Sequence, residues 1–206
     1  MLYSYVITRD YGFAPNPFYG YCTLATCKPR IRRYAQIGDW IVGTESISMG
    51  HDGKRIIFAM KIDEKLTFRE YWNDMRFQCK KPVMNGSKKQ MYGDNIYEYN
   101  EIDNVLVQVD SHHSLANGEK NNLNYDRDVK GEYVLISKKF WYFGSEGPEI
   151  PDIFSEQIIK RGIGHRIIHD ENLIRVFIAW LENNYKEGYL GEPYEFKKDF
   201  KRYNGI

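Results

Sequence analysis

The sequence from Asp10 to Gly43 reads DYGFAPNPFYGYCTLATCKPRIRRYAQIGDWIVG. Most of this stretch follows no helical or strand periodicity. A connection of this length inside a compact domain is more often functional than idle. Asn16 lies between two prolines, which keep it out of helical geometry. We therefore expect the stretch to line the main pocket, with Asn16 and Thr23 among the ligand-binding residues; the alternative is a solvated loop with a basic rim.

Four cations fall within the six positions from Lys28 to Arg33. The arginine side chain presents a planar fork of donors that suits oxyanions. In an extended segment, alternation along R-I-R would place Arg30 and Arg32 on one face. We predict that Arg30 and Arg32 contact phosphate or another anion and that Lys28 assists them. A solvated charge cluster is the alternative.

The chain as a whole carries almost no net charge. Its 29 basic and 28 acidic residues leave a formal charge of +1, so any anion binding has to come from a local patch. The 206 residues fit one sizeable domain, and we expect residues 1–206 to be a single domain whose part beyond about residue 150 is helical. A hydrophobic content of 42% is that of a soluble globular protein.

The three cysteines are Cys22, Cys27 and Cys79. This odd number favours a reducing environment over a disulfide framework, so we expect a cytoplasmic protein. Met1 leads directly into a predicted strand rather than a signal peptide. No apolar run approaches the roughly 18 residues that a membrane span needs, and no membrane partner is expected.

Short β-branched and aromatic segments predict strands at residues 2–8, 21–26, 40–42, 55–62, 105–109 and 133–136. Residues 49–54 (MGHDGK) are predicted to form a hairpin turn. Strands come first and helices gather late, which predicts the α+β class. A small mixed or barrel-like sheet is expected, with a PUA-like barrel as one form of it.

Two helices have clear signals. Thr67 and Glu70 form a capping box that predicts a helix over 66–77. Asp170 is predicted to cap a helix over 170–184, whose apolar stripe indicates core packing rather than a groove-reading role. A helical turn is expected at 31–35 and a helix at 152–161. The polar segments 80–95 and 110–130 are predicted to be loops.

Cys27 is the candidate nucleophile, because a cation beside a thiol stabilises the thiolate. A nucleophile also needs a positioned base, and no histidine is near Cys27 in the sequence. A small buried cysteine is therefore the alternative. His112 and His113 lie in a polar segment and are predicted to be solvated. His165, in RGIGHR, is the best candidate for a histidine that touches a ligand, with Arg166 beside it as an anion contact.

The aromatic block FWYFG, residues 140–144, offers Trp141 and Tyr142 as faces for base stacking. Plain core packing is the alternative. The P-loop, GxGxxG, HExxH and GxSxG motifs are absent, which argues against an NTPase, a dinucleotide enzyme, a zincin and an α/β-hydrolase. The cysteine spacing does not match CxxC, and neither a metal site nor a cofactor is expected.

Residues 10–44 resemble the N-terminal signature of the nucleotide modification associated domain, second type. That bacterial and phage family is linked to DNA base hypermodification systems. The resemblance continues through WYFG (141–144) and RGIGHR (161–166), so it covers nearly the whole chain. The GD and apolar strand at 38–42 are also similar to PUA, ASCH and EVE domains, small β-barrels that bind nucleic acid or single modified bases.

The family resemblance implies a role around modified nucleotides and leaves two main hypotheses. The first is a binding module for a nucleotide or modified base, free or within DNA, working beside other modification-system proteins. The second is an enzyme acting on a nucleotide or nucleobase, with Asp10 or Asp39 as acid–base and Cys27 or His165 assisting. Convergence of Asp10, Cys27 and His165 in space would favour the enzyme. A structural role in a larger complex is a third option.

Overall fold

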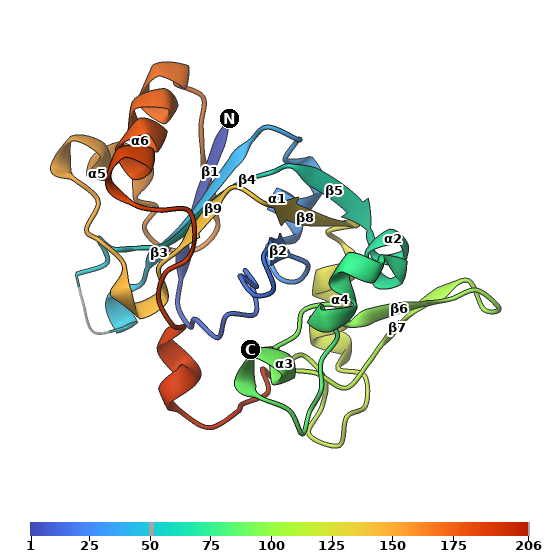
Figure 1. The fold of residues 1–206 in the computed structure, drawn as a ribbon. Coiled ribbons are helices and arrows are strands. Elements are labelled where there is room, and N and C mark those ends of the chain that lie inside the picture. The colour runs from blue at the N-terminus through green and yellow to red at the C-terminus, as the bar shows by residue number, and fades with distance from the viewer. Residues whose placement is uncertain (50–51, 206) are drawn as a thin grey trace.

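The computed structural model describes residues 1–49 and 52–205, and the strands within these ranges form three sheets (Figure 1). The largest sheet has the strand order β10-β1-β3-β4-β9-β11. Its strands are β1 (Leu2–Ile7), β3 (Trp40–Glu45), β4 (Ile56–Lys61), β9 (Phe140–Tyr142), β10 (His165–Ile168) and β11 (Gly188–Tyr189). β1 pairs with β3 and β9 pairs with β11 in parallel, and the other pairings in this sheet are antiparallel.

Both faces of the six-stranded sheet are buried. Successive side chains along a strand point to opposite faces, so each strand contributes to two cores. Leu2 and Val42 pack on one face under α5 (Asp152–Ile158) and α6 (Glu171–Asn184). Their neighbours Tyr3 and Ile41 pack on the other face with α1 (Pro29–Tyr34) and β2 (Cys22–Leu24). The sheet therefore forms the middle layer of this half of the molecule.

The second half is built on a smaller antiparallel sheet of β2, β8 (Tyr133–Ser137) and β5 (Glu64–Thr67). A separate hairpin joins β6 (Tyr97–Asn100) to β7 (Val105–Gln108). The helices of this half are α2 (Phe68–Asn73), α3 (Lys88–Met91) and α4 (Asn122–Val129). Short 3₁₀ turns occupy Ile47–Met49, Met75–Lys80, Gly144–Glu146 and Tyr194–Lys197.

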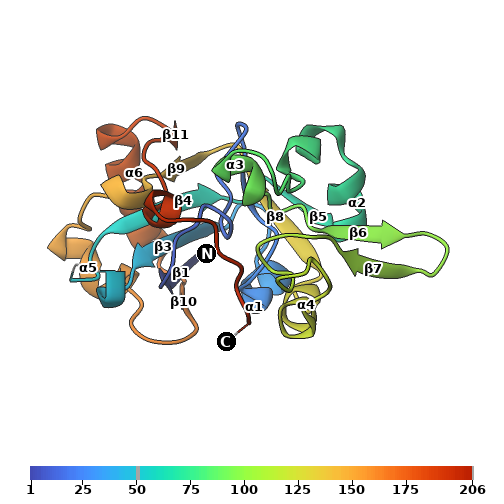
Figure 2. The ribbon, with the colours of Figure 1, turned by 90° about the horizontal axis from the view of Figure 1, so that it is seen from below.

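The C-terminal tail, beyond β11, crosses from the α6 side of the molecule to the side that carries α3 and α4 (Figures 1 and 2). Its backbone is tied to the second half by hydrogen bonds. Tyr203 N donates to the carbonyl of His112 at 2.7 Å, and the side-chain amides of Asn121 and Asn124 donate to the carbonyls of Asn204 and Tyr203. The tail thus holds the two halves beside each other.

The α+β class is confirmed, and the mixed sheets are open rather than closed into a barrel. Short helices also occur early in the chain, while the longest, α6, lies near its end. The capping box of Thr67 and Glu70 and the cap at Asp170 are both present. The segments 80–95 and 110–130 were wrongly predicted as loops throughout, since they contain α3 and α4. The predicted turn at 49–54 includes residues outside the described ranges.

Within the described residues, every helix is too short or too polar to cross a membrane.

Candidate functional site

A cavity of about 900 Å³ opens beside the C-terminal end of β1. Its wall is built from separate parts of the chain: the end of β1, the residues that follow it, the turn that leads into α1, Ser48, the His112–His113 pair, Arg127 of α4, the Gly164–His165 pair and the C-terminal tail. Its lining includes Tyr5, Arg9, Tyr11, Phe13, Cys27, Lys28, Arg30, His112, His113, Arg127, His165 and Tyr203. Many of these residues belong to the 10–43 stretch, so the stretch contributes a large part of the cavity wall.

Cys27 lies in a sharp turn between β2 and α1. Cys27 and Lys28 both have positive φ angles, 55° and 37°, and Pro29 then begins the helix. Non-glycine residues seldom adopt this left-handed conformation, and such residues cluster at functional sites. The turn places the thiol in the cavity wall.

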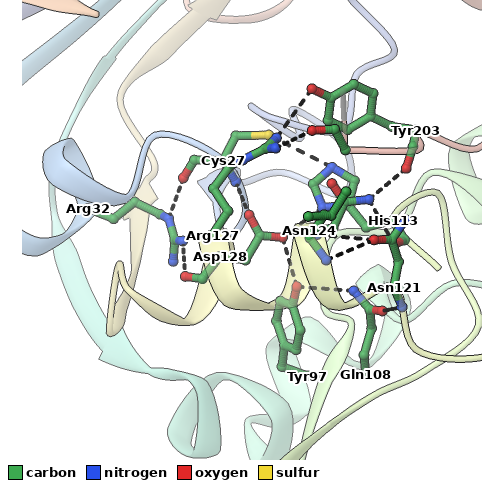
Figure 3. Close-up of polar contacts among 12 residues, drawn as sticks. Cys27, Arg32, Tyr97, Gln108, His113, Asn121, Asn124, Arg127, Asp128 and Tyr203 are labelled. Carbon is green, nitrogen blue, oxygen red and sulfur yellow. Dashed lines mark hydrogen bonds and ion pairs between the residues drawn. The ribbon is translucent and has the colours of Figure 1, made fainter.

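Cys27, His113 and Asp128 form a hydrogen-bonded array in that wall (Figure 3). The sulfur of Cys27 lies 3.8 Å from Nε2 of His113. Nδ1 of His113 lies 2.7 Å from Oδ2 of Asp128, and Tyr97 donates to the same carboxylate oxygen at 2.8 Å. The other oxygen, Oδ1, accepts the backbone N–H of Cys27 at 2.7 Å. The thiol, the imidazole and the carboxylate therefore lie in one hydrogen-bonded chain, the arrangement that a nucleophile, its base and an orienting third group require.

The protonation of this array follows from its burial and its charges. Burial alone would lower the pKa of His113, but Asp128 and Cys27 outweigh it and raise that pKa to about 9. Burial favours the protonated form of Asp128, yet the charge and hydrogen bond of His113 hold the pKa of Asp128 below its usual value. At neutral pH, His113 thus carries a positive charge next to the sulfur and Asp128 is an anion.

Arg32 stabilises the array from within the core, away from the cavity wall. Its side chain is fully buried and donates from Nε to the carbonyl of Cys27 and from Nη1 to the carbonyl of Tyr133, each at 2.8 Å. Its Nη2 donates to the backbone carbonyl of Asp128. Gly131 leaves the room that the guanidinium needs, since a Cβ there would lie 2.3 Å from Arg32 Cζ. Arg32 therefore positions Cys27 and Asp128 instead of reaching the cavity.

Aromatic rings form one side of the cavity. Tyr11 and Phe13 pack against the ring of His112, with centroid distances of 4.6 and 4.9 Å. Burial and the neighbouring positive His113 lower the pKa of His112 to about 3, so the ring of His112 is neutral. It donates from Nδ1 to the carbonyl of Lys201 in the tail. The prediction that His112 and His113 are solvated was wrong, because both are buried.

Cations line the remainder of the cavity. Arg9, Lys28 and Arg30 all line it, and Lys28 Nζ lies 4.2 Å from the centroid of the Tyr5 ring. Burial lowers the pKa of Lys28. Arg127 comes from α4 and donates to the Tyr203 hydroxyl at 3.3 Å. Burial alone would lower the pKa of Arg127, but Tyr203 and then Cys27 raise it. The influence of Cys27 shows that the guanidinium lies within electrostatic reach of the sulfur.

The other predicted catalytic residues do not join this array. Asp10 is buried behind the wall, where it accepts the Tyr142 hydroxyl at 2.5 Å and its burial raises its pKa to about 6. Asp39 accepts the N-terminal ammonium of Met1 at 2.8 Å. His165 does line the cavity, but it has no hydrogen bond to Cys27, His113 or Asp128 among the described contacts. The hydrogen bonds of Cys27 thus join it to His113 and Asp128, and the convergence of Asp10, Cys27 and His165 that would have favoured the enzyme is not found among the described contacts.

Several predicted ligand-binding residues belong to the core. Asn16 and Thr23 are fully buried: Asn16 accepts Lys80 Nζ at 2.6 Å and Thr23 donates to Asp94 at 2.7 Å. Trp141 and Tyr142 have no exposed surface and lie outside the cavity wall. Because α1 is helical, the alternation that would bring Arg30 and Arg32 to one face does not apply. Of the cationic run, Lys28 and Arg30 reach the cavity.

Arg166 lies in β10 and lines a second, smaller cavity, to which His165 also contributes. Its Nη1 donates to the carbonyls of Glu156 and Gln157 at 2.6 and 2.8 Å.

Sequence reasoning missed His113, Arg127 and Asp128, which lie 86 or more residues beyond Cys27. In the described residues no group of three or more His, Cys, Asp and Glu side chains is arranged to hold a metal ion.

The three cysteines have different surroundings. Cys22 is fully buried in β2, and burial raises the pKa of its thiol. Cys79 is exposed on the second half of the molecule. Cys27 is half-buried in the cavity wall beside His113. All three are free thiols.

The chain was also compared with known proteins. No match was found among the curated proteins or among the solved structures. The sequence profile of one family, described as nucleotide modification associated domain 2, matches residues 1–200, which include Cys27, His113 and Asp128. The chain therefore belongs to the nucleotide modification associated domain 2 family, and a role connected with nucleotide modification follows from that membership.

Proposed function

We propose that this protein is an enzyme that acts on a nucleotide or nucleobase through Cys27. The observation that carries the proposal is the Cys27–His113–Asp128 array, with Sγ 3.8 Å from His113 Nε2 and Nδ1 2.7 Å from Asp128. The same order of nucleophile, base and orienting carboxylate recurs on unrelated folds and is recognised by geometry. Membership in a family associated with nucleotide modification supports a nucleotide or nucleobase as the substrate class.

In the proposed reaction, Cys27 is the nucleophile and His113 the acid. With a pKa of about 9, His113 holds its second proton at neutral pH, next to the sulfur that reacts as a thiolate in this proposal. The sulfur adds to an electrophilic carbon of the substrate, and an electron pair moves to a neighbouring substrate atom. His113 Nε2 donates its proton to that atom. Asp128 keeps the imidazole in the required orientation and balances its charge throughout.

The remaining wall of the cavity suits the rest of a nucleotide. Lys28, Arg30 and Arg9 offer charge to a phosphate group, and the rings of Tyr11 and Phe13 offer an apolar side to a base. Arg127, held by Tyr203, lies near the sulfur and can stabilise negative charge that develops on the substrate.

A second candidate function is a binding module that holds a nucleotide or modified base without reacting with it. The combination of cations and aromatic rings around one cavity of about 900 Å³ favours this reading, because such a pocket needs no acid or base. The two functions differ in one feature, which is whether the sulfur forms a bond with the ligand.

The test is incubation with a panel of natural and modified nucleoside monophosphates, followed by intact-protein mass, product mass and thermal shift. A substrate should give turnover or a mass adduct with the wild type. Cys27→Ser should abolish both, and His113→Gln should slow them by about 10²–10⁴-fold. Cys79→Ser is the matched control, because it removes an exposed thiol far from the array.

Two results would overturn the enzyme proposal. One is a thermal shift with a nucleotide but no adduct or product in the wild type, which leaves the binding module. The other is a Cys27→Ser variant that turns over substrate at the wild-type rate.

A further inference from the structure

A second cavity adjoins the main one. Its volume is about 610 Å³, and its wall includes Lys54, Lys160, Arg161 and Arg166. His165 lines both cavities, so they meet at one residue. Neither the family nor the array around Cys27 assigns a role to this second cavity.

The two cavities together concentrate positive charge on a protein whose net charge is only +1. Eight Lys and Arg side chains line them, against two glutamates, Glu156 and Glu195. Lys54 is in part balanced by Asp52 and Asp152, at 3.9 and 4.0 Å. After burial, the strongest influences that lower the pKa of His165 are Arg30, Lys28 and Lys160, so the cations of both cavities converge on this histidine.

Ile163 stands between the two cavities on the loop that leads into β10. Its side chain is fully exposed. It is flanked by Gly162 and Gly164, which have positive φ angles of 74° and 90° and no atom within 4 Å of an added Cβ. Gly164 lines the main cavity and Arg161 lines the second. An apolar side chain with basic side chains on both sides matches the wedges that proteins insert between stacked bases.

We propose that the second cavity and Ile163 form a docking site for a stacked polynucleotide, so that the base entering the main cavity is extruded from a strand. This inference rests on the proposed function and names the form of its substrate. Lys160 and Arg161 contact backbone phosphates next to the reacting nucleotide. Ile163 fills the space that the extruded base leaves in the stack, which lowers the cost of unstacking.

The first experiment measures affinity for duplex DNA and duplex RNA of one sequence, and for a nucleoside monophosphate, across a salt series. Lys160→Ala/Arg161→Ala should flatten the salt dependence for the duplex by about 0.7–0.9 in log–log slope per lost phosphate contact. It should leave the monophosphate unaffected. Arg69→Ala/Lys81→Ala is the matched control, because it removes two cations that line neither cavity.

The second experiment places 2-aminopurine at the target position of the duplex, where its fluorescence rises on unstacking. The wild type should raise the signal, and Ile163→Ala should lose most of that rise while keeping its affinity for the monophosphate. Ile102→Ala is the control, because Ile102 is also almost fully exposed but lies at the turn of the β6–β7 hairpin. Neither residue is packed, so both variants should fold.

The outcomes separate this inference from the proposed function. Monophosphate turnover that needs Cys27, with no duplex binding by any variant, overturns the docking site and leaves the enzyme intact. Duplex binding that needs Lys160 and Arg161, with no adduct or turnover, supports the docking site and overturns the enzyme. Binding to anionic lipid vesicles but not to a duplex would assign the basic surface and Ile163 to a membrane and would overturn the docking site.

Discussion

The backbone N–H of Cys27 donates a 2.7 Å hydrogen bond to the carboxylate of Asp128, 101 residues further along the chain. The same carboxylate accepts from the ring of His113. One buried anion therefore fixes both the backbone of Cys27, the proposed nucleophile, and the orientation of the His113 ring. A change at Asp128 should alter both at once.

Asp128→Asn should lower the pKa of His113 from about 9, because Cys27 would then have to oppose the effect of burial without the carboxylate. Burial, which favours the neutral ring, would no longer be opposed by the carboxylate. NMR titration of the His113 ring measures this directly. Asp126→Asn, an exposed neighbour on the same helix, is the control and should leave the titration unchanged. A His113 that still titrates near 9 in Asp128→Asn would contradict the assigned role of the carboxylate.

The same raised pKa makes stability depend on alkaline pH. Because the folded protein holds the His113 proton more tightly than the unfolded chain, the stabilisation is complete below pH 6.5 and is lost as pH rises through about 9. The loss should be on the order of 3 kcal/mol over that window. Denaturant unfolding of the wild type and His113→Gln at pH 6.5, 8 and 9.5 tests it. Equal slopes with pH in the two proteins would refute the linkage.

Arg32→Met should destabilise the fold by about 3–5 kcal/mol, because it removes one member of a buried charge network. The variant also leaves the buried carbonyls of Cys27 and Tyr133 without their donor. Arg33→Ala is the control: its partly exposed pair with Glu132 at 3.0 Å should contribute no more than about 1 kcal/mol. Unfolding midpoints of both variants measure the two losses of stability. A loss for Arg32→Met as small as that for Arg33→Ala would contradict the structural role of Arg32.

Phe177→Ala should cost about 3–5 kcal/mol of stability and leave ligand preference unchanged in the protein that folds. Phe177 is fully buried between α6 and the six-stranded sheet, with Phe154 at a ring-centroid distance of 5.5 Å. Val176→Ala, on the exposed side of α6, should have little effect. Unfolding midpoint and nucleotide affinity are measured together. Wild-type stability with lost binding would make α6 part of the site.

Local signals in the sequence predicted what local interactions determine. The capping box of Thr67 and Glu70 and the cap at Asp170 act within three residues; α6 starts directly after Asp170, and α2 starts at Phe68, two residues later than the predicted start. The exact extent of the first helix differs, since α2 ends at Asn73 and a 3₁₀ turn follows. Such boundaries depend on packing that a propensity does not contain.

The site depends on contacts between distant residues, and this is why the sequence identified only one member of the array. Cys27 was recognised from Lys28 beside it, but His113 and Asp128 lie in a segment so polar that it reads as loop. Their burial arises because they satisfy one another, with Tyr97 and Arg32, inside the fold. A single sequence carries no period or spacing that marks such a network.

The three free thiols provide an internal calibration for cysteine-directed chemical probes. Cys79 is exposed and should report plain accessibility, while Cys22 is enclosed in β2 and should stay unlabelled until the chain unfolds. Labelling of Cys27 beyond that of Cys79, despite its smaller exposure, would measure activation of its thiol by the cationic groups around it, His113 among them. A single labelling experiment on the intact protein, read by peptide mass, therefore grades accessibility, burial and catalytic activation side by side.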